Sequence, residues 1–318
     1  MRPKTSIVTV TFNSREGLRK YIESIDVEAR ETPLDVTVVD NASSDGTVEL
    51  LRVEAKRPFL KIIANEVNLG FARSSNMGAT ASVGQYLLFL NPDTAVKPTA
   101  IRKLTNFLDE HPEAGVVAPK ILNEDGSLQF SCRDEPRILF AVLEAFRLWR
   151  LSPGLFGGYR YASWHHNTTR AVGWVSGACL MIRKSLFEEI GGFDESFFLY
   201  YEDTDLCLRV RRKGFSVYYL PEALVIHTKG ASSKTARESV VLNDCLSALY
   251  FFRKLNGRWS CLFLRLALFA SSVAKGIMAY VLSLIRLDRN YRVIGQSYLH
   301  TAAHLACFRS LRAFPNCR

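Results

Sequence analysis

The stretch "YLLFLNPDT", residues 86–94, decides the fold class. Its first five residues are all apolar. This indicates a strand buried on both faces, because a strand with one face in water alternates apolar and polar residues. Asn91, Pro92 and Asp93 end the strand. Asn-Pro-Asp-Thr is favourable for a turn, and an aspartate after a buried strand is also a candidate metal ligand. Both interpretations of Asp93 stay open at this point.

Strands alternate with helices before this stretch. We expect strands at 6–12, 34–40, 59–65 and 86–91, and helices at 15–25, 43–53 and 70–82. Such alternation with short links predicts an α/β fold: a mostly parallel sheet with helices on both faces. Ligands bind at the carboxyl ends of such strands. Polar residues follow these ends, so we expect a pocket for a polar ligand lined by Asn13, Asp40, Asn41, Asn65, Asn91 and Asp93.

The sequence lacks the glycine-rich signatures of two common nucleotide-binding classes. There is no GxxxxGK[ST] segment, and no GxGxxG opens a helix. These absences argue against a P-loop enzyme and against a dinucleotide-dependent dehydrogenase.

Further strands and helices are predicted after residue 171. We expect a strand at 174–182, a helix at 184–190, and two strands at 215–221 and 223–227. Between them, "YYEDTDLCLRVRRKG" predicts a helix that ends at Gly214. Its acidic start and basic end match the helix dipole, so simple capping is one interpretation of Glu202, Asp203 and Asp205.

The net charge of +10 is concentrated in the C-terminal part of the 318-residue chain. Residues 251–318 contain eleven Lys or Arg and one acid, so the remainder is neutral. A neutral body argues against a nucleic-acid-binding protein. A basic tail that is also apolar favours binding to an anionic membrane surface. The seven cysteines form no CxxC pair, and no signal peptide precedes the first strand, which fits a reducing cytoplasm.

Residues 236–318 are predicted to form a basic helical tail. Its most apolar stretch, 261–287, is interrupted by Arg265 and Lys275. A spanning helix needs ~20 predominantly apolar residues. We therefore favour one or two amphipathic helices lying in the membrane interface over a buried helix or a membrane span.

Six motifs in a fixed order carry a family resemblance: "TVTFNS", "VVDNASSDGT", "NLGFARSSN", "FLNPDT", "VSGACLMIRK" and "YYEDTDLCLRVRRKGFSVYYLPEALVIH". Together they resemble the family-2 glycosyltransferases of the GT-A fold, within them the bacterial rhamnosyltransferase-type branch. The resemblance covers residues 5 to about 230. It implies a glycosyltransferase domain at 1–235, with a nucleotide-sugar-binding half at 1–125, a variable insertion at 132–166 and an acceptor half at 171–235.

The resemblance implies a divalent cation, Mn²⁺ or Mg²⁺, that neutralises the leaving diphosphate of a nucleoside-diphosphate sugar. The family places an Asp-x-Asp where this chain has Asn91-Pro92-Asp93. Metal binding is therefore assigned to Asp93, with Asn91 as a polar contact to the donor. His227 matches the place of a second ligand; by itself it would be interpreted as a structural histidine.

Other donor contacts also follow from the resemblance. Thr9, Thr11 and Asp40 correspond to the nucleoside site, although a helix cap or Asx-turn is the other interpretation of Asp40. Asn68, Gly70 and Arg73 correspond to the segment under the diphosphate; the alternative for Arg73 is a solvated helix face. All six are donor-binding candidates: Thr9, Thr11, Asp40, Asn68, Gly70 and Arg73.

The acidic pair after residue 201 corresponds to the catalytic motif of the family. The resemblance implies an inverting transfer, which needs a base for the proton of the acceptor hydroxyl. We assign this role to Asp203, with Glu202 orienting it, while capping remains the interpretation of Asp205. The resemblance places Trp174, Ser176 and Gly177 on the acceptor side. For Trp174, a core position is the alternative.

The resemblance implies a peripheral enzyme on the cytoplasmic face of a bacterial inner membrane. It would move rhamnose, or another deoxyhexose or hexose, from dTDP-rhamnose or a UDP-sugar to a polyprenyl-diphosphate-linked glycan in cell-envelope polysaccharide synthesis. Two other functions are possible for a chain with this fold. A non-catalytic scaffold that binds sugar nucleotides is suggested only by Asn91. A nucleotidyltransferase would need a glycine-rich basic loop, which residues 9–20 do not supply.

Overall fold

The computed structural model describes residues 3–228 and 237–307, which form two compact units. The first unit contains 3–135, 164–195 and 202–228. The second contains 136–163, 196–201 and 237–307. The tail predicted at 236–318 thus folds together with residues 136–163 and 196–201, which the sequence assigned to the glycosyltransferase domain at 1–235. Each unit has its own packed interior.

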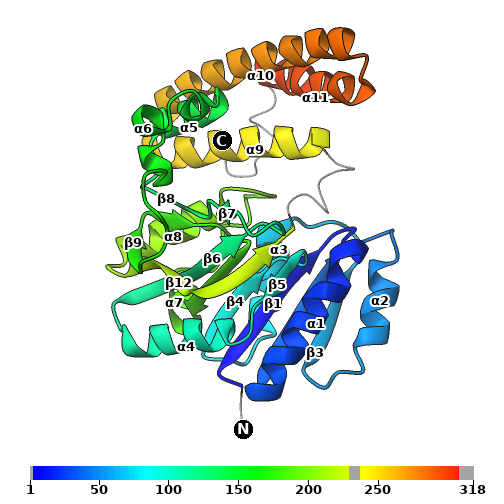
Figure 1. The fold of residues 1–318 in the computed structure, drawn as a ribbon, viewed down its shortest axis with the longest axis vertical. Coiled ribbons are helices and arrows are strands. Elements are labelled where there is room, and N and C mark those ends of the chain that lie inside the picture. Colours follow the sequence, from blue (N-terminus) through cyan, green and yellow to red (C-terminus); the bar gives the residue numbers. More distant parts are fainter. Residues whose placement is uncertain (1–2, 229–236, 308–318) are drawn as a thin grey trace. The chain divides into compact units, whose positions relative to one another are not determined.

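A ten-stranded sheet forms the centre of the first unit (Figure 1). Its main order is β3-β2-β1-β4-β11-β6-β12-β5, with β7 beside β6 and β9 beside β12. The strands are β1 (Thr5–Thr11), β2 (Leu34–Asn41), β3 (Leu60–Asn65), β4 (Tyr86–Leu90), β5 (Thr94–Val96), β6 (Ala114–Leu122), β7 (Leu128–Gln129), β9 (Arg170–Val172), β11 (Cys179–Arg183) and β12 (Ser216–His227). A separate pair joins β8 (Cys132–Arg133) to β10 (Trp174–Val175).

Helices cover both faces of the parallel part of this sheet. On one face, Leu18 and Ile25 of α1 share a buried cluster with Ile7 of β1. On the other face, Gly78 of α3 lies so close to Val8 that a Cβ there would be 2.5 Å from it. The small residues of α3 therefore allow close packing. The helices of the first unit are α1 (Arg15–Glu31), α2 (Thr47–Glu54), α3 (Phe71–Thr80), α4 (Ala100–Glu110), α7 (Lys184–Glu189) and α8 (Glu202–Arg212).

The predicted α/β fold is confirmed, and its sheet is mixed in the second half. The strands β3, β2, β1 and β4 are parallel, as expected. By contrast, β11 runs antiparallel to both β4 and β6. The strand predicted at 174–182 is interrupted, because the backbone N–H groups of Ser176 and Gly177 bond to Ser131 O and to Asp203 rather than to a neighbouring strand. The two strands predicted at 215–227 form the single bulged strand β12.

The second unit is helical. Its elements are α5 (Ile138–Ala145), η1 (Leu148–Arg150), α6 (Pro153–Phe156), η2 (Gly158–Arg160), α9 (Arg237–Asn256), α10 (Arg258–Arg286) and α11 (Arg289–Ala306). Helices α10 and α11 pack closely where two glycines meet: a Cβ on Gly276 would lie 2.7 Å from Leu299, and one on Gly295 would lie 3.1 Å from Tyr280. Helix α10 runs without a break through the apolar stretch predicted at 261–287, as far as Arg286. By length and composition α10 could cross a membrane.

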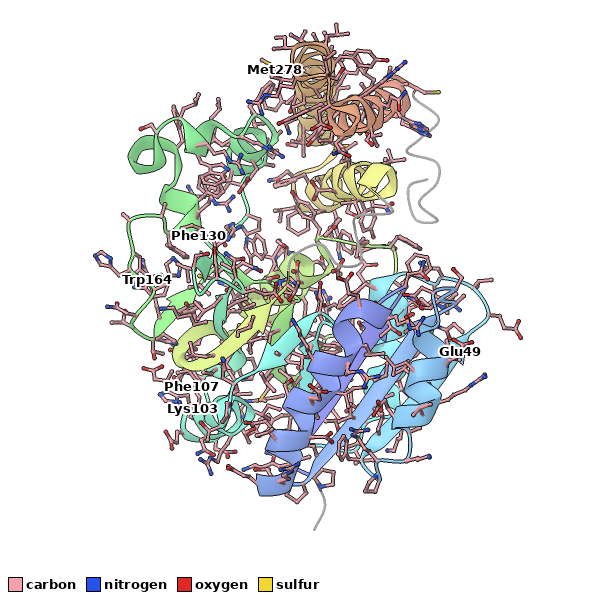
Figure 2. All side chains as sticks on the ribbon, turned by 45° about the vertical axis from the view of Figure 1, so that its right-hand side comes forward. Glu49, Lys103, Phe107, Phe130, Trp164 and Met278 are labelled. Carbon is pink, nitrogen blue, oxygen red and sulfur yellow. The ribbon has the colours of Figure 1, made fainter. Side chains whose placement is uncertain are left out.

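The insertion predicted at 132–166 is divided between the units. Its central part, 136–163, belongs to the second unit. Its last residue, His166, is fully buried in the first unit against Trp164, Phe130 and Tyr219, at ring-centroid distances of 4.2, 5.4 and 5.4 Å (Figure 2). The end of the insertion is therefore anchored by aromatic packing. The structure shows no disulfide between the six cysteines in the described part of the chain.

Candidate active site

Two candidate metal ligands meet at the end of the sheet. Asp93 follows β4, and His227 is the last residue of β12. Antiparallel pairing of β12 with β5 sets His227 opposite Thr94. As a result, Asp93 Oδ1 lies 3.1 Å from His227 Nε2, and the two side chains are 10% and 13% exposed. The Thr228 N–H donates to Asp93 O at 2.9 Å and fixes the turn. The structure thus brings together the two residues to which the sequence assigned the metal.

A chain of hydrogen bonds sets the tautomer of His227. It starts at the Asp125 carboxylate, which can only accept, and whose pKa is lowered by the Ser127 hydroxyl that donates to it at 2.6 Å. Ser127 Oγ therefore accepts from Asn123 Nδ2 at 2.8 Å. Asn123 Oδ1 then accepts from Gln129 Nε2, also at 2.8 Å. Finally, Gln129 Oε1 lies 2.7 Å from His227 Nδ1, so this ring nitrogen carries the proton.

When the ring carries only this proton, the lone pair of His227 lies on Nε2 and faces the carboxylate of Asp93. A neutral imidazole and a carboxylate then present two acceptors to each other at 3.1 Å. Such a pair is complementary to a cation, and both ligand types suit Mn²⁺. Within the described residues, no cluster of three or more His, Cys, Asp or Glu side chains could hold a metal. A divalent ion with two protein ligands fits when donor phosphates complete its coordination.

Asp203 lies in the first turn of α8 and is held by two backbone N–H groups. Oδ2 accepts from Gly177 at 2.7 Å, and Oδ1 accepts from Thr204 at 2.6 Å. Part of its side chain remains exposed. The surrounding protein raises the pKa of Asp203, because burial disfavours the charged form, and the two N–H donors oppose this effect. The arrangement fixes a carboxylate that can both reach a ligand and accept a proton.

Glu202 precedes Asp203 in the first turn of α8. It is buried, and Oε2 has no hydrogen-bond partner among the described residues. Burial, followed by the negative charge of Asp203, raises the pKa of Glu202 well above its ordinary value. No bond joins Glu202 to Asp203; the bonds that orient Asp203 come from Gly177 and Thr204. Asp205, by contrast, pairs with Arg209 at 2.7 Å within α8, which agrees with a structural role.

One short segment connects the candidate base to the candidate metal site. The Asn91 N–H donates to Ala178 O at 3.0 Å, next to the Gly177 N–H that binds Asp203. This contact follows from the antiparallel pairing of β11 with β4, in which Cys179 lies opposite Leu90. Consecutive residues thus fix the turn that carries Asp93 and the carboxylate of Asp203. Both candidate centres belong to the first unit.

The predicted nucleoside contacts are engaged inside the protein. Asp40 is fully buried and accepts from Thr11 Oγ1 at 2.8 Å, and from the Ser43 hydroxyl and N–H at 2.6 and 2.9 Å. These bonds reach Ser43, three residues further on, and hold the loop that follows β2; an Asx-turn would instead use the N–H of residue 42. The Thr9 hydroxyl donates to Leu90 O at 2.8 Å. The polar atoms of all three side chains are therefore paired locally, and their contact with a nucleoside stays a prediction.

The segment predicted to lie under the diphosphate is a tight turn before α3. Gly70 has φ +83°, in the left-handed region that favours glycine, and its N–H donates to Asn68 Oδ1 at 2.9 Å. Arg73 is 57% exposed, and its nearest acid is Glu195 at 3.9 Å, a contact of little energetic weight. The guanidinium is thus not fixed by a strong pair, and its phosphate contact stays a prediction.

Of the three acceptor-side candidates, only Gly177 contacts Asp203 directly. A Cβ built on this glycine would lie 3.5 Å from the carboxylate. Ser176 shapes the same segment, since its Oγ accepts from the Ala178 N–H at 3.3 Å. Trp174 is half-buried in β10 and packs on the Arg133 guanidinium at 5.7 Å. The sequence did not identify Gln129 as a site residue, because no local pattern marks a side chain whose partner is 98 residues away. It did not identify Thr204 either, because Thr204 holds Asp203 through its backbone N–H, a group that every residue except proline carries.

Gln129 is expected to position His227. Gln129→Leu removes the acceptor for Nδ1–H and frees the ring to rotate or change tautomer. Loss of such a partner typically costs about 10–100-fold in metal affinity. We expect this loss in Mn²⁺ titrations with a nucleotide donor present, whereas Gln129→Glu retains an acceptor and most of the affinity. Ser127→Ala, three hydrogen bonds away from His227 in this network, serves as the mild control. Equal affinities of Gln129→Leu and wild type would contradict the positioning role.

Comparison with known proteins agrees with this geometry. The model of glycosyl transferase family 2 matches residues 6–191, and that of the N-terminal domain of galactosyltransferase matches residues 162–229. The N-acetylglucosaminyl-diphospho-decaprenol L-rhamnosyltransferase of Mycobacterium tuberculosis is 33% identical over 242 residues, which cover 71% of this chain and 76% of the relative. The Escherichia coli rhamnosyltransferase WbbL is 26% identical over 70% of this chain and 82% of its own.

Solved structures share the fold. The mannosyltransferase PcManGT from Pyrobaculum calidifontis, in complex with GDP-Man and Mn²⁺, has a TM-score of 0.57 at 18% identity, over 98% of this chain and 88% of its own. GalNAc-T7 with UDP, GalNAc and Mn²⁺ has the same TM-score at 17% identity, over 79% of this chain and 50% of its own. Together, the family match, the rhamnosyltransferase relatives and the shared fold establish that this chain is a glycosyltransferase of family 2.

Proposed function

We propose that the enzyme is an inverting, metal-dependent transferase that moves a sugar from a nucleoside-diphosphate donor to a lipid-linked glycan. The observation that carries the proposal is the pairing of Asp93 with His227 beside the segment that holds Asp203. An ion-binding pair and a carboxylate base are the two groups that displacement of a diphosphate by a hydroxyl requires. The rhamnosyltransferase relatives support rhamnose as the sugar, with another deoxyhexose or hexose as the alternative.

In the proposed reaction, the acceptor hydroxyl loses its proton to Asp203 as its oxygen bonds to the anomeric carbon. The bond from that carbon to the diphosphate breaks, and the electron pair leaves with the diphosphate oxygen. Gly177 and Thr204 keep the Asp203 carboxylate aimed at the acceptor. Asp93 and His227 would hold Mn²⁺ or Mg²⁺, which neutralises the leaving diphosphate when bound. A single displacement from the face opposite the leaving group inverts the anomeric configuration.

The acceptor class is inferred from relatives and from the second unit. The Mycobacterium tuberculosis relative is named for a diphospho-decaprenol acceptor. Helix α10 exposes six large apolar residues that lie within about 60° of one another around the helix, at 100° per residue: Trp259, Phe263, Leu266, Ile277, Val281 and Leu284. An exposed apolar face on a basic helix favours an in-plane position in an anionic membrane surface.

We place the enzyme as a peripheral protein on the cytoplasmic face of a bacterial inner membrane. Sedimentation with phosphatidylglycerol vesicles tests the membrane part. Wild type should bind, and replacing Leu266 and Ile277 by glutamate should abolish the binding. Unchanged sedimentation of that double variant would exclude α10 as the membrane-binding face.

Donor binding tests the enzymatic proposal. Calorimetry on detergent-purified protein would compare dTDP-rhamnose, UDP-glucose, UDP-galactose, UDP-galactofuranose and GDP-mannose, each with and without Mn²⁺. We expect one dTDP- or UDP-sugar to bind, and only with metal, because the protein supplies too few ligands to hold the ion alone. Slow Mn²⁺-dependent hydrolysis of the same donor would separate an enzyme from a sugar-nucleotide-binding scaffold. If no nucleotide sugar binds under any condition, the proposal fails.

A further inference from the structure

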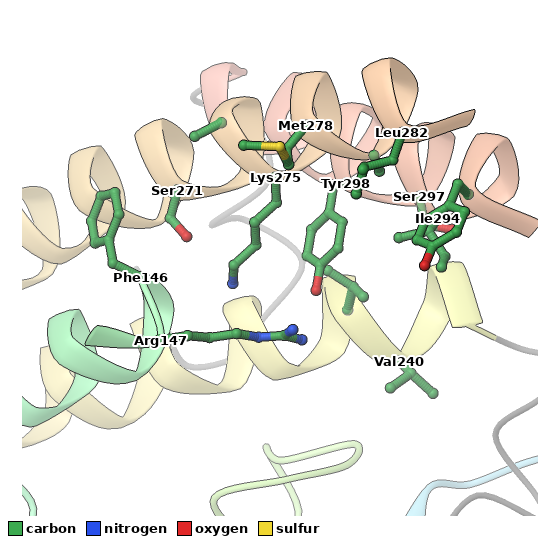
Figure 3. A pocket seen from close by; sticks show the side chains of 14 residues that line it. Phe146, Arg147, Val240, Ser271, Lys275, Met278, Leu282, Ile294, Ser297 and Tyr298 are labelled. Atoms are coloured by element: carbon green, nitrogen blue, oxygen red, sulfur yellow. The ribbon is translucent and has the colours of Figure 1, made fainter. Parts of the chain in front are cut away.

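A cavity of about 660 Å³ lies within the second unit, and none of the residues of the proposed reaction lines it. It is bounded by α9, α10 and α11 and by the residues that follow α5 (Figure 3). Its volume is in the range of about 300–1,000 Å³ that is usual for small-molecule sites. Most of its lining is apolar, including Phe146, Val241, Leu282 and Ile294. The cavity is therefore suited to a ligand with a substantial apolar part.

Two cations converge in this apolar cavity. Lys275 extends from α10 toward Arg147, and the Tyr298 hydroxyl points the same way from α11 (Figure 3). Burial, and next the positive charge of Arg147, lower the pKa of Lys275. The backbone of Arg147 adopts φ +54°, a conformation that costs a non-glycine residue about 1–3 kcal/mol. Two positive side chains, Lys275 and Arg147, thus face each other in an apolar cavity, although their proximity is unfavourable in the absence of a ligand. This arrangement indicates a site for an anion.

The acidic neighbours do not neutralise these cations directly. Among the residues that the structure describes, no carboxylate lies within 4.0 Å of the head group of Lys275 or Arg147. Glu144 forms an ion pair with Arg160, whereas Asp244 on α9 interacts with Lys275 over more than 4.0 Å, and burial raises the pKa of the Asp244 carboxyl to about 6. Lys275 instead lies 5.2 Å from the centre of the Tyr298 ring. The cavity thus combines two cations and a hydroxyl group with apolar walls.

We propose that this cavity binds a lipid phosphate, with the phosphate between Lys275 and Arg147 and the first part of the tail against the apolar lining. Met278 lines the cavity and is 61% exposed, so a tail can leave beside it toward the apolar face of α10. The same chemistry is offered by an isoprenyl phosphate or diphosphate and by an anionic phospholipid. The inference extends the proposed function, whose acceptor would carry such a group, but binding here needs neither donor nor metal.

Farnesyl diphosphate, farnesol and inorganic pyrophosphate separate the contributions of tail and head group. Their binding to the full-length protein in neutral detergent would be measured by calorimetry without nucleotide. We expect farnesyl diphosphate to bind at least about tenfold more tightly than farnesol or pyrophosphate, because only it uses both parts of the site. Competition by phosphatidylglycerol, with phosphatidylcholine for comparison, then distinguishes a site for any anionic lipid from one selective for isoprenyl phosphates. Equal affinities for all three probes would overturn the proposal.

Matched variants locate the binding. Lys275→Gln and Arg147→Gln should each weaken farnesyl diphosphate about tenfold or more, since each removes a charge-assisted contact. Arg258→Gln removes an exposed charge from the first turn of the same helix and should have no effect. Ala274→Trp, at an exposed position of the lining, should block the cavity without removing charge. Affinities of Lys275→Gln and Ala274→Trp equal to that of Arg258→Gln would place the ligand elsewhere.

Donor chemistry provides an independent readout. The Mn²⁺-dependent hydrolysis of the donor, which tests the proposed function, should be the same in these four variants as in wild type. Loss of lipid binding with normal donor hydrolysis supports the inference. Normal hydrolysis together with unselective lipid binding overturns the inference and leaves the proposed function in place.

Discussion

Asp203→Asn is expected to reduce the rate of sugar transfer by about 10²–10⁴-fold, the usual contribution of a general base. The amide has nearly the same shape, and its oxygen can accept the bond from Gly177 while the bond from Thr204 is lost, so folding should be preserved. It cannot take the proton of the acceptor hydroxyl. Donor affinity in the presence of Mn²⁺ should change little, because no donor contact is assigned to this carboxylate. Steady-state transfer and donor calorimetry on the same preparation would measure both effects.

Glu202→Gln is the matched control for Asp203→Asn. Burial and the negative charge of Asp203 raise the pKa of Glu202 and so favour its neutral form, for which an amide is a close substitute. We expect less than about tenfold loss of transfer, smaller than the effect of losing a base. If Glu202→Gln were the more damaging change, the base would be Glu202, and the assignment would have to be reversed.

The pH dependence of transfer follows from the same pair. Because burial raises the pKa of Asp203, the carboxylate is protonated at a higher pH than an ordinary aspartate. Transfer should therefore fall as the pH decreases through a value above 3.8, the ordinary pKa of the group. For Glu202, the raised pKa means that the folded protein keeps a proton that the unfolded chain releases. The stability from this proton is present at low pH and is lost as the pH rises through the raised pKa.

Asp93→Asn is expected to abolish Mn²⁺-dependent donor binding, with a fall in transfer of roughly 10²–10³-fold. The estimate corresponds to several kcal/mol of charge stabilisation by the metal. Asparagine would give the turn the sequence Asn-Pro-Asn, which still offers a neutral oxygen but no negative charge to the ion. The Thr228 N–H bonds to the backbone of residue 93, so the turn should persist. Calorimetry with and without metal, as for wild type, would measure the change.

Two further variants sharpen the metal assignment. His227→Gln should weaken Mn²⁺ less than Asp93→Asn does, since it replaces a neutral ligand with another neutral group. Asp26→Asn removes a carboxylate of α1 that pairs with Arg57, and it should leave donor binding unchanged. Retention of metal-dependent donor binding by Asp93→Asn would show that the ion binds elsewhere.

Local patterns in the sequence were enough to predict much of the fold. Each strand from β1 to β4 is short and rich in apolar residues, and each helix between them has apolar residues at helical spacing or begins after a turn. The strand before His227 and the acidic start of α8 were also recognised. These features are encoded by neighbouring residues, which is why a single sequence can show them.

Long-range pairing could not be predicted in the same way. The antiparallel insertion of β11 between β4 and β6 depends on contacts across the sheet. The role of Gln129 depends on a partner at the end of a different strand. Tyr200 and Tyr201 both have positive φ directly before α8, a conformation that no local preference of tyrosine favours. The tail was recognised from its composition, whereas its cavity depends on how three helices and Arg147 pack.

The short segment from Ser176 to Ala178 limits how this chain can change in length. Its Gly177 N–H binds Asp203, and its Ala178 carbonyl binds the Asn91 N–H, so both bonds depend on the same register of β11 against β4. Adding or deleting one residue here would shift that register and break one of the two bonds. Homologous enzymes with new specificities should therefore keep this segment at constant length and gain or lose residues in the 136–163 stretch.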